Sequence, residues 1–389
     1  MQSMIKKYSH IPVSEGKEIE VEFMDDVNEG DKVVIKREFE NIIKNPVGLT
    51  GIPKAPSGYC SVAISRDGNY IAVTSYDGSP YINVYKKSTI GWNKLTVNDV
   101  PAGSYYGVGL SDDGTYLVAS KTTSPYIVFF QNTNDVYDKL SDPAVLPTGH
   151  SLFIAITPDN YVLYHERSSP YNLYIYNIAT RDLISRNVVY SDYSYYYDIF
   201  YGTRTLIAIA ISYYIYLYEY TGNGSLATLA NVNTGGIVYS CAFSTDEKYI
   251  TAGHKTYEIQ GNSLVEMPSV ITFTSNNYSL CGINPTSWVR GGTSQLYYLT
   301  KVNDRFTYTN IMSIGSGNND YGTKRAGNTF ISGWSGSPYG IVFEKDTAGL
   351  NKAYKSDNIY NVNGYCIALH SARRGQVGRA LVLWDDGCL

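Results

Sequence analysis

A repeat with a period of about 45 residues constrains the fold of this chain more than any other feature. The tripeptide Ser-Pro-Tyr stands at 79–81, 124–126 and 169–171, and the Asp-Gly pair at 67–68 returns at 113–114. Within 59–97, runs of β-branched and aromatic residues alternate with turn signals, which predicts four short antiparallel strands. A four-stranded unit that recurs at this spacing is typical of a β-propeller blade.

The repeats cover nearly the whole chain. Complete repeats are expected at 59–97, 105–140, 151–183, 195–229, 238–267, 278–312 and 321–355, and a half repeat with only first and second strands at 365–387. Residues 17–23 and 32–39 form a charged hairpin pattern that matches the missing third and fourth strands. Because a ring of blades must close or leave sticky sheet edges, 17–23 is expected to pair with 379–385.

The sequence therefore predicts an all-β fold, a β-propeller of eight blades, each a four-stranded antiparallel sheet. Seven blades stay open as the alternative. Two domains are expected. Residues 1–50 form an N-terminal hairpin that closes the ring or acts as an attachment arm, and residues 51–389 form the propeller. A connector rich in Gly and Pro, residues 47–58, spans the boundary between them.

Charge and hydropathy exclude several classes of function. The chain has 31 basic and 35 acidic residues and a net charge of −4, without a basic stripe, so nucleic acid is not expected as a partner. No run approaches the roughly 20 apolar residues of a membrane span, and the first residues lack a signal-peptide core. We expect synthesis in a cytoplasm and no membrane insertion.

Residues suited to catalysis or metal binding do not form a recognisable pattern. The five histidines lack ligand or base spacing, and most aspartates of the repeats fall in hairpin turns, where Asp satisfies backbone donors. The four cysteines at first-strand positions are expected to be buried thiols without disulfides, and CxxC spacing is absent; they are Cys60, Cys241, Cys281 and Cys366. We therefore predict no catalytic residues, no metal site and no cofactor.

The 39 tyrosines are the strongest binding signal. Many stand in the loop between second and third strands, or where a first strand begins, and both places lie on one face of a propeller. An aromatic ring with a hydroxyl suits sugar rings and protein surfaces alike. The alternative is that each ring packs between blades. The predicted ligand- or partner-binding residues are Tyr81, Tyr126, Tyr171, Tyr195, Tyr196, Tyr214 and Tyr339.

Three segments carry a family resemblance. SRDGNYIA at 65–72, SDDGTYLV at 111–118 and STDEKYIT at 244–251 resemble the hairpin of WD40-like and lactonase-like propellers. This resemblance specifies the fold and not the function, because propellers include enzymes, scaffolds and lectins. Trp-Asp does not end the third strands, as it does in true WD repeats.

In composition the chain is similar to virion proteins of tailed phages, including tail and receptor-binding proteins. That resemblance implies a non-catalytic structural protein of the phage tail or particle surface. It would bind other virion proteins and a host-surface glycan or protein, and its location would be the virion. A propeller enzyme of the lactonase or lyase type and a cytoplasmic scaffold propeller stay open as alternatives.

Overall fold

The computed structural model describes most of the chain. Described are residues 17–23, 26–29, 32–38, 43–49, and 61–268 except 77, 170, 189–193, 203, 253 and 254. Further on they are 280–284, 287–302, 305–318, 323–326, 329–333, 340–345, 350–355, 366–368 and 377–382. Two compact units result, one of residues 43–345 and one of residues 1–42 with 346–389.

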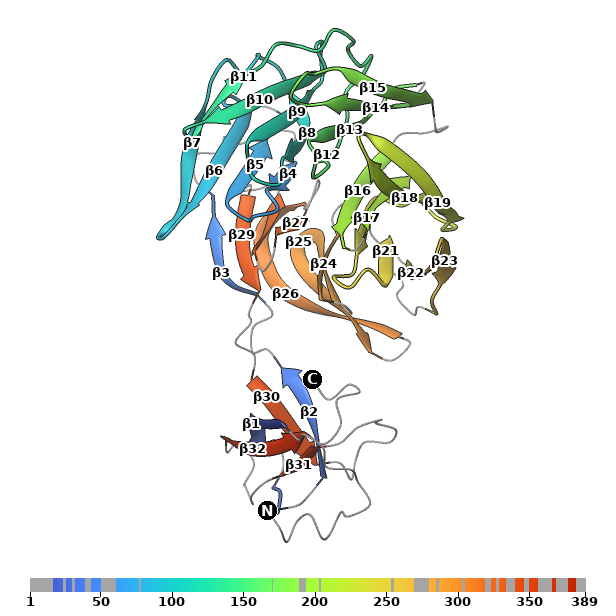
Figure 1. Ribbon diagram of the computed structural model, residues 1–389. Helices are drawn as coiled ribbons and strands as arrows, with labels where there is room; N and C mark the ends of the chain where they lie inside the picture. The colour runs from blue at the N-terminus through green and yellow to red at the C-terminus, as the bar shows by residue number, and fades with distance from the viewer. Residues whose placement is uncertain are drawn as a thin grey trace. The chain divides into compact units, whose positions relative to one another are not determined.

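The described residues are all-β and include no helix, so no helix there is long and apolar enough to cross a membrane. In the larger unit, consecutive strands form antiparallel sheets in chain order (Figure 1). The first two groups are β4 (Val62–Ile64), β5 (Tyr70–Thr74), β6 (Ile82–Ser88) and β7 (Gly91–Val97), then β8 (Tyr105–Leu110), β9 (Tyr116–Lys121), β10 (Ile127–Thr133) and β11 (Val136–Lys139). Their outer strands β7 and β11 pair in parallel, and β4 contacts β8, so the eight strands make one nearly closed sheet.

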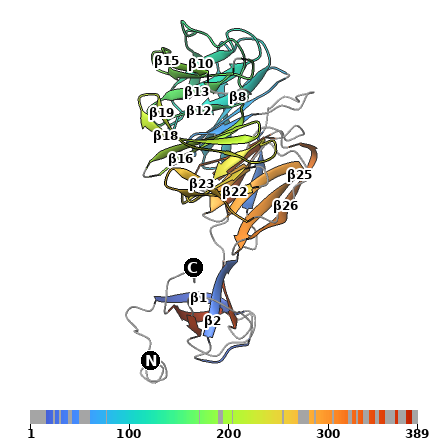
Figure 2. The ribbon, with the colours of Figure 1, turned by 90° about the vertical axis from the view of Figure 1, so that its right-hand side faces the viewer.

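Three four-stranded sheets follow. They are β12 (Ile154–Ile156), β13 (Tyr161–His165), β14 (Asn172–Asn177) and β15 (Leu183–Val188); β16 (Ser194–Tyr201), β17 (Thr205–Ile211), β18 (Tyr214–Gly222) and β19 (Ser225–Asn233); and β20 (Cys241–Phe243), β21 (Tyr249–Ala252), β22 (Lys255–Gln260) and β23 (Ser263–Glu266). The next sheet has β24 (Leu280–Asn284), β25 (Ser287–Val302) and β26 (Arg305–Asn318), of which the last two make a long hairpin (Figure 2).

The last sheet of the larger unit combines distant parts of the chain. It consists of β27 (Thr323–Ala326), β28 (Thr329–Gly333), β29 (Gly340–Lys345) and β3 (Ile43–Gly48), in that order. Strand β3 pairs antiparallel with β29, with Val47 opposite Val342. The segment expected to be a connector from residue 47 thus contributes the end of a strand, because the edge of β29 offers it a ladder of backbone partners.

The first strands of these groups contact one another in a cycle. The order is β4, β8, β12, β16, β20, β24, β27 and again β4 (Figure 1). The apolar core lies between neighbouring groups: Val84 packs with Val108 and Leu117, and Leu49 and Val342 pack with Val62. Each sheet therefore buries both faces against its neighbours, which explains why its inner strands are apolar on both sides.

The smaller unit is a closed five-stranded barrel. Its strands follow the order β1 (Lys17–Phe23), β30 (Leu350–Lys355), β2 (Lys32–Glu38), β31 (Cys366–Ala368) and β32 (Val377–Val382). The pairing of 17–23 with the C-terminal segment is confirmed for the described residues, since Lys17–Glu22 pair antiparallel with Val377–Val382.

The surroundings of that pairing differ from those expected for an eighth blade. Strand β30 lies between β1 and β2, so the two N-terminal strands are not a hairpin. The five strands β1, β30, β2, β31 and β32 instead close a sheet of their own. The boundaries of the compact units also differ from the expected boundary at residue 50. The first lies between residues 42 and 43, because β3 belongs to the larger unit. The second lies between residues 345 and 346, because the segment 346–389 belongs to the same unit as the N-terminal strands.

The turns between first and second strands have the chemistry predicted for their aspartates. Asp113 accepts hydrogen bonds from the Thr115 amide (2.9 Å) and the Ser111 hydroxyl (2.8 Å), and Ser111 in turn receives the Tyr116 amide (2.8 Å). Ser65 with Asp67, Thr157 with Asp159 and Ser244 with Asp246 repeat this hydroxyl–carboxylate contact. These carboxylates fix turns, which is the structural role expected for them.

Candidate functional site

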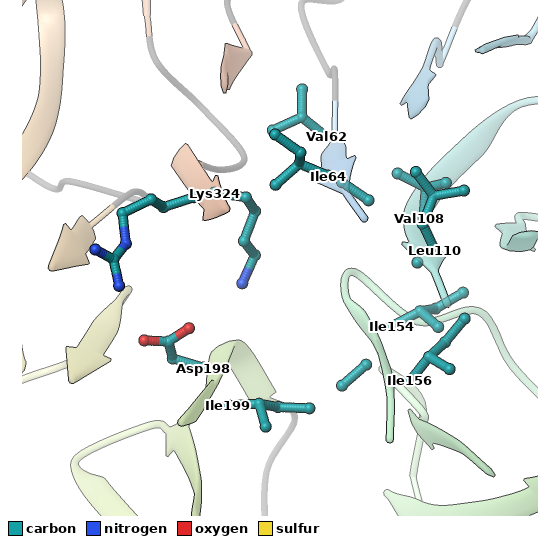
Figure 3. A pocket seen from close by; sticks show the side chains of 13 residues that line it. Val62, Ile64, Val108, Leu110, Ile154, Ile156, Asp198, Ile199 and Lys324 are labelled. Carbon is teal, nitrogen blue, oxygen red and sulfur yellow. The ribbon is translucent and has the colours of Figure 1, made fainter. Parts of the chain in front are cut away.

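A pocket lies between the first strands at the centre of their cycle, in the described part of the larger unit. Its volume is about 120 Å³, and its lining comes from β4, β8, β12, β16 and β27. Most of that lining is aliphatic, from Val62 and Ile64 round to Ile154 and Ile156 (Figure 3). A smaller cavity of about 80 Å³, lined also by Phe243 and Cys281, shares residues with it.

Three charged residues interrupt this aliphatic lining. They are Asp198 on β16 and Lys324 and Arg325 on β27, and all three line both cavities. In Figure 3 the Asp198 carboxylate and the Lys324 side chain point into the pocket from opposite sides. The pocket therefore combines an apolar wall with a charged wall, an arrangement common to small-molecule sites.

Asp198 stands at a position that is apolar in the first two groups of strands. Strand pairing places Asp198 opposite Ala208, as Val62 lies opposite Val73 and Val108 opposite Ala119. Asp198 was not predicted as a site residue, because a single carboxylate within a strand has no recognisable spacing pattern. Comparison of the first strands by their pairing shows it as a carboxylate where other groups have Ile154 or Cys241.

The enclosed position changes the acidity of these groups. Burial raises the pKa of the Asp198 carboxyl, although the charges of Lys324 and Arg325 and the Phe243 amide, which donates to Oδ2 at 3.0 Å, act in the opposite direction. Burial also lowers the pKa of Lys324, and Asp198 offsets only part of that effect. Desolvation is therefore the larger influence at both groups.

Tyr196 packs against Lys324, one of the three charged residues of the pocket. Its ring is completely buried. It meets the Phe153 ring edge-on, with 4.8 Å between the two ring centroids, and the Lys324 Nζ lies 4.1 Å from its own centroid. A cation above a tyrosine face is attracted by the ring quadrupole. Tyr196 was predicted to contact a ligand or partner; its ring has 0% exposure and lies beneath the Lys324 ammonium.

The other predicted tyrosines fall into two groups. Tyr81, Tyr126 and Tyr171 are half-buried in the loops between second and third strands, and Tyr214 is 39% exposed at the start of β18. We call these four residues the tyrosine rim. Tyr195 belongs to β16 by its backbone, but its side chain lies outside the described part, as does all of Tyr339.

Two rim residues have an unusual backbone. Tyr126 and Tyr171 have φ angles of 58° and 55°, in the left-handed region that Gly and Asn favour. Each closes its loop with the same hydrogen bond, from the Tyr126 amide to the Thr123 carbonyl (3.0 Å) and from the Tyr171 amide to the Ser168 carbonyl (2.7 Å). A bulky residue retained in a strained position is a pointer to function.

An aromatic stack lies beside these loops. Tyr106 stacks on His150 with 4.8 Å between ring centroids, whereas the Tyr76 ring, with its centroid 5.0 Å from that of Tyr106, is tilted by 45°. Arg167 lies 5.9 Å from the Tyr106 centroid. Burial, with the nearby charge of Arg167, lowers the pKa of His150 to about 4. This cluster of rings was not predicted, because contacts between rings of separate segments have no sequence signature.

The described thiols agree with the prediction of buried, unpaired cysteines. Cys241 and Cys281 are free and buried, and burial raises the pKa of Cys281 to about 12 and that of Cys241 further. The side chains of Cys60 and Cys366 lie outside the described part. Within the described part, no group of three or more His, Cys, Asp or Glu side chains is placed to hold a metal ion.

Comparison with known proteins gives no family. No protein-family model matches the sequence, and no curated protein sequence matches it. The arguments for function therefore rest on the geometry of this chain.

Proposed function

We propose that the larger unit is a seven-bladed β-propeller and that it serves as a non-catalytic binding module. The cyclic contacts of the first strands and the pairing of β3 with β29 support seven blades over eight. In this arrangement the N-terminal strand β3 completes the last blade. The segments expected to form an eighth blade, 17–23, 32–39 and 365–387, would then contribute their strands to the smaller unit.

The tyrosine rim is the observation that carries the binding role. Tyr81, Tyr126 and Tyr171 recur at equivalent loop positions in three successive groups of strands, and two of them keep a left-handed backbone that costs about 1 kcal/mol or more. All three rings are only partly buried, so each keeps some accessible surface on its loop for a partner, although Tyr81 also packs against the core.

The amino-acid composition of the chain and the tyrosine rim together favour one class of partner. We propose a component of a phage tail or particle surface, in which the rim binds a host-surface glycan or another virion protein. Aromatic faces stack on sugar rings, and tyrosine hydroxyls hydrogen-bond to sugar hydroxyls. The location would be the virion, with synthesis in the host cytoplasm.

Glycan arrays that carry bacterial surface polysaccharides test the rim with the full-length protein and the triple variant Y81A/Y126A/Y171A. Loss of one hot-spot ring costs roughly 2 kcal/mol, about 30-fold in affinity, so the triple variant should bind no glycan that the wild type binds. R66A, which changes an exposed residue in a turn at the other end of its sheet, is the control and should bind as the wild type does. Equal binding by the triple variant would refute the rim.

Immunogold labelling of particles released by producing cells tests the location. Label on intact particles supports a virion component. Label confined to the soluble cell extract would support the scaffold alternative.

A propeller enzyme stays a second candidate because of one observation, the charged wall of the central pocket. An acid whose pKa is raised beside a lysine whose pKa is lowered is a pattern found at acid–base sites. Lactone hydrolysis and polysaccharide cleavage by the wild type, abolished in D198N, would favour that candidate. No turnover by the wild type on either substrate class would favour the binding module.

A further inference from the structure

The charges that line the central pocket do not balance. Among the described lining residues, Lys324 and Arg325 contribute two positive charges and Asp198 one negative charge. The aliphatic wall opposite them supplies no counter-charge and lowers the local dielectric, which strengthens electrostatic interactions in the pocket. Among the described residues that line the pocket, the cationic side chains therefore outnumber the carboxylate.

Contacts with neighbouring residues position the Lys324 ammonium and the Asp198 carboxylate. The Lys324 ammonium lies 4.1 Å above the centroid of the buried Tyr196 ring. One oxygen of Asp198, Oδ2, already accepts the Phe243 amide of β20, which fixes the carboxylate to the neighbouring sheet. A guanidinium such as that of Arg325 presents a planar fork of donors that matches the two oxygens of a carboxylate or phosphate.

The volume limits what can enter. On the same volume scale a cavity of about 150 Å³ holds a benzene molecule, so a pocket of about 120 Å³ has room for an inorganic phosphate ion or the acidic end of a ligand. The aliphatic wall would contact any carbon attached to the acidic group.

From this charge excess, placement and volume, we infer that the central pocket binds a small oxyanion, a phosphate or a carboxylate group, between Lys324 and Arg325. This site is separate from the tyrosine rim. A virion or scaffold protein with such a site would hold an acidic ligand group, or an acidic side chain of a partner, at the centre of its propeller.

Isothermal titration calorimetry with the full-length protein tests the site. Sodium phosphate and sodium acetate are titrated separately, near neutral pH, in sodium chloride of matched ionic strength. Saturable binding of at least one of them with a stoichiometry of one supports the inference, and the arm that binds more tightly identifies the preferred oxyanion. Failure of both to bind would overturn it.

Three variants locate the binding. R325Q removes one donor fork and should weaken the affinity at least 10-fold. D198N removes the competing negative charge, keeps an acceptor for the Phe243 amide, and should tighten the affinity about 10-fold. K248Q is the control, since it changes the net charge equally at a side chain that is 69% exposed, and should bind as the wild type does.

The direction of the D198N effect keeps the test decisive even if R325Q does not fold. Tighter binding by D198N supports the central pocket, whereas unchanged or weaker binding would place any oxyanion elsewhere and overturn the inference. The tyrosine rim is untouched by these variants, so glycan binding by the same proteins reports separately on the rim.

Discussion

Replacement of Tyr196 by alanine should destabilise the larger unit strongly. The ring is fully buried against Phe153 and beneath Lys324. Truncation of a buried aromatic side chain costs about 3–5 kcal/mol, and loss of the cation–ring contact adds roughly 0.5–2 kcal/mol. We expect Y196A to lower the free energy of unfolding by about 4 kcal/mol or more.

The conservative variant separates the ring from its hydroxyl. The Tyr196 hydroxyl donates to the Leu280 carbonyl over a long 3.4 Å, so Y196F should cost only about 0.5–1 kcal/mol. Tyr214, also predicted as a contact residue but 39% exposed, is the matched control. Y214A should cost less than about 1 kcal/mol.

Urea unfolding at 25 °C, followed by thiol labelling of Cys241 and Cys281, measures the larger unit, because both thiols are buried there. Because both thiols belong to the larger unit, their labelling reports on that unit alone. A loss of less than about 1 kcal/mol in Y196A would show that the ring is not packed in the core and would restore Tyr196 as a contact residue.

Further outcomes follow from the same geometry. Cys241 and Cys281 should react with a thiol reagent at mildly alkaline pH only after denaturation, because burial raises the pKa of both thiols; rapid labelling of the folded protein would contradict their placement. His150 has a pKa of about 4, below its unfolded value of 6.5, so the folded state binds fewer protons and stability falls as the pH drops from 6.5 towards 4. The melting temperature of H150F, which keeps a ring beside Tyr106, should depend less on pH in that range, and an unchanged slope would refute this. D113A should cost about 1–3 kcal/mol in urea unfolding, because the Asp113 carboxylate accepts three hydrogen bonds in its turn, and no loss would contradict that role.

The repeat predicted much of the larger unit because its signals are local. Turn residues such as Asp113 and alternating strands are written within a few positions of each other, and the structure has β5 and β9 where the repeat placed second strands. The all-β class follows from the same local signals.

The partners of the terminal strands could not be read in this way. Segment 17–23 was matched correctly to the C-terminal segment, but strand pairing between distant residues has no local code, so the intrusion of β30 and the use of β3 in the last sheet were not foreseen. Both depend on which sheet edge is open after the other strands have paired.

The site shows the same limit. A tyrosine can be recognised in the sequence, but its exposure cannot, because exposure depends on how the strands pack. Tyr196, for example, is completely buried. Asp198, Lys324 and Arg325 are 126 residues or more apart between β16 and β27, and only closure of the strand cycle brings them to one pocket.

Completion of the last sheet by β3 is the claim on which the seven-bladed account depends most, and a disulfide tests it directly. In the double variant V47C/V342C the two cysteines occupy opposed positions of β3 and β29. After mild oxidation, the account predicts an intramolecular crosslink that shifts mobility on a non-reducing gel and is identified by mass spectrometry. Both single variants and V47C/I331C, whose second cysteine lies on β28, should give none. If V47C/V342C stays uncrosslinked while the protein is folded, β3 does not complete the last sheet and the seven-bladed account is wrong.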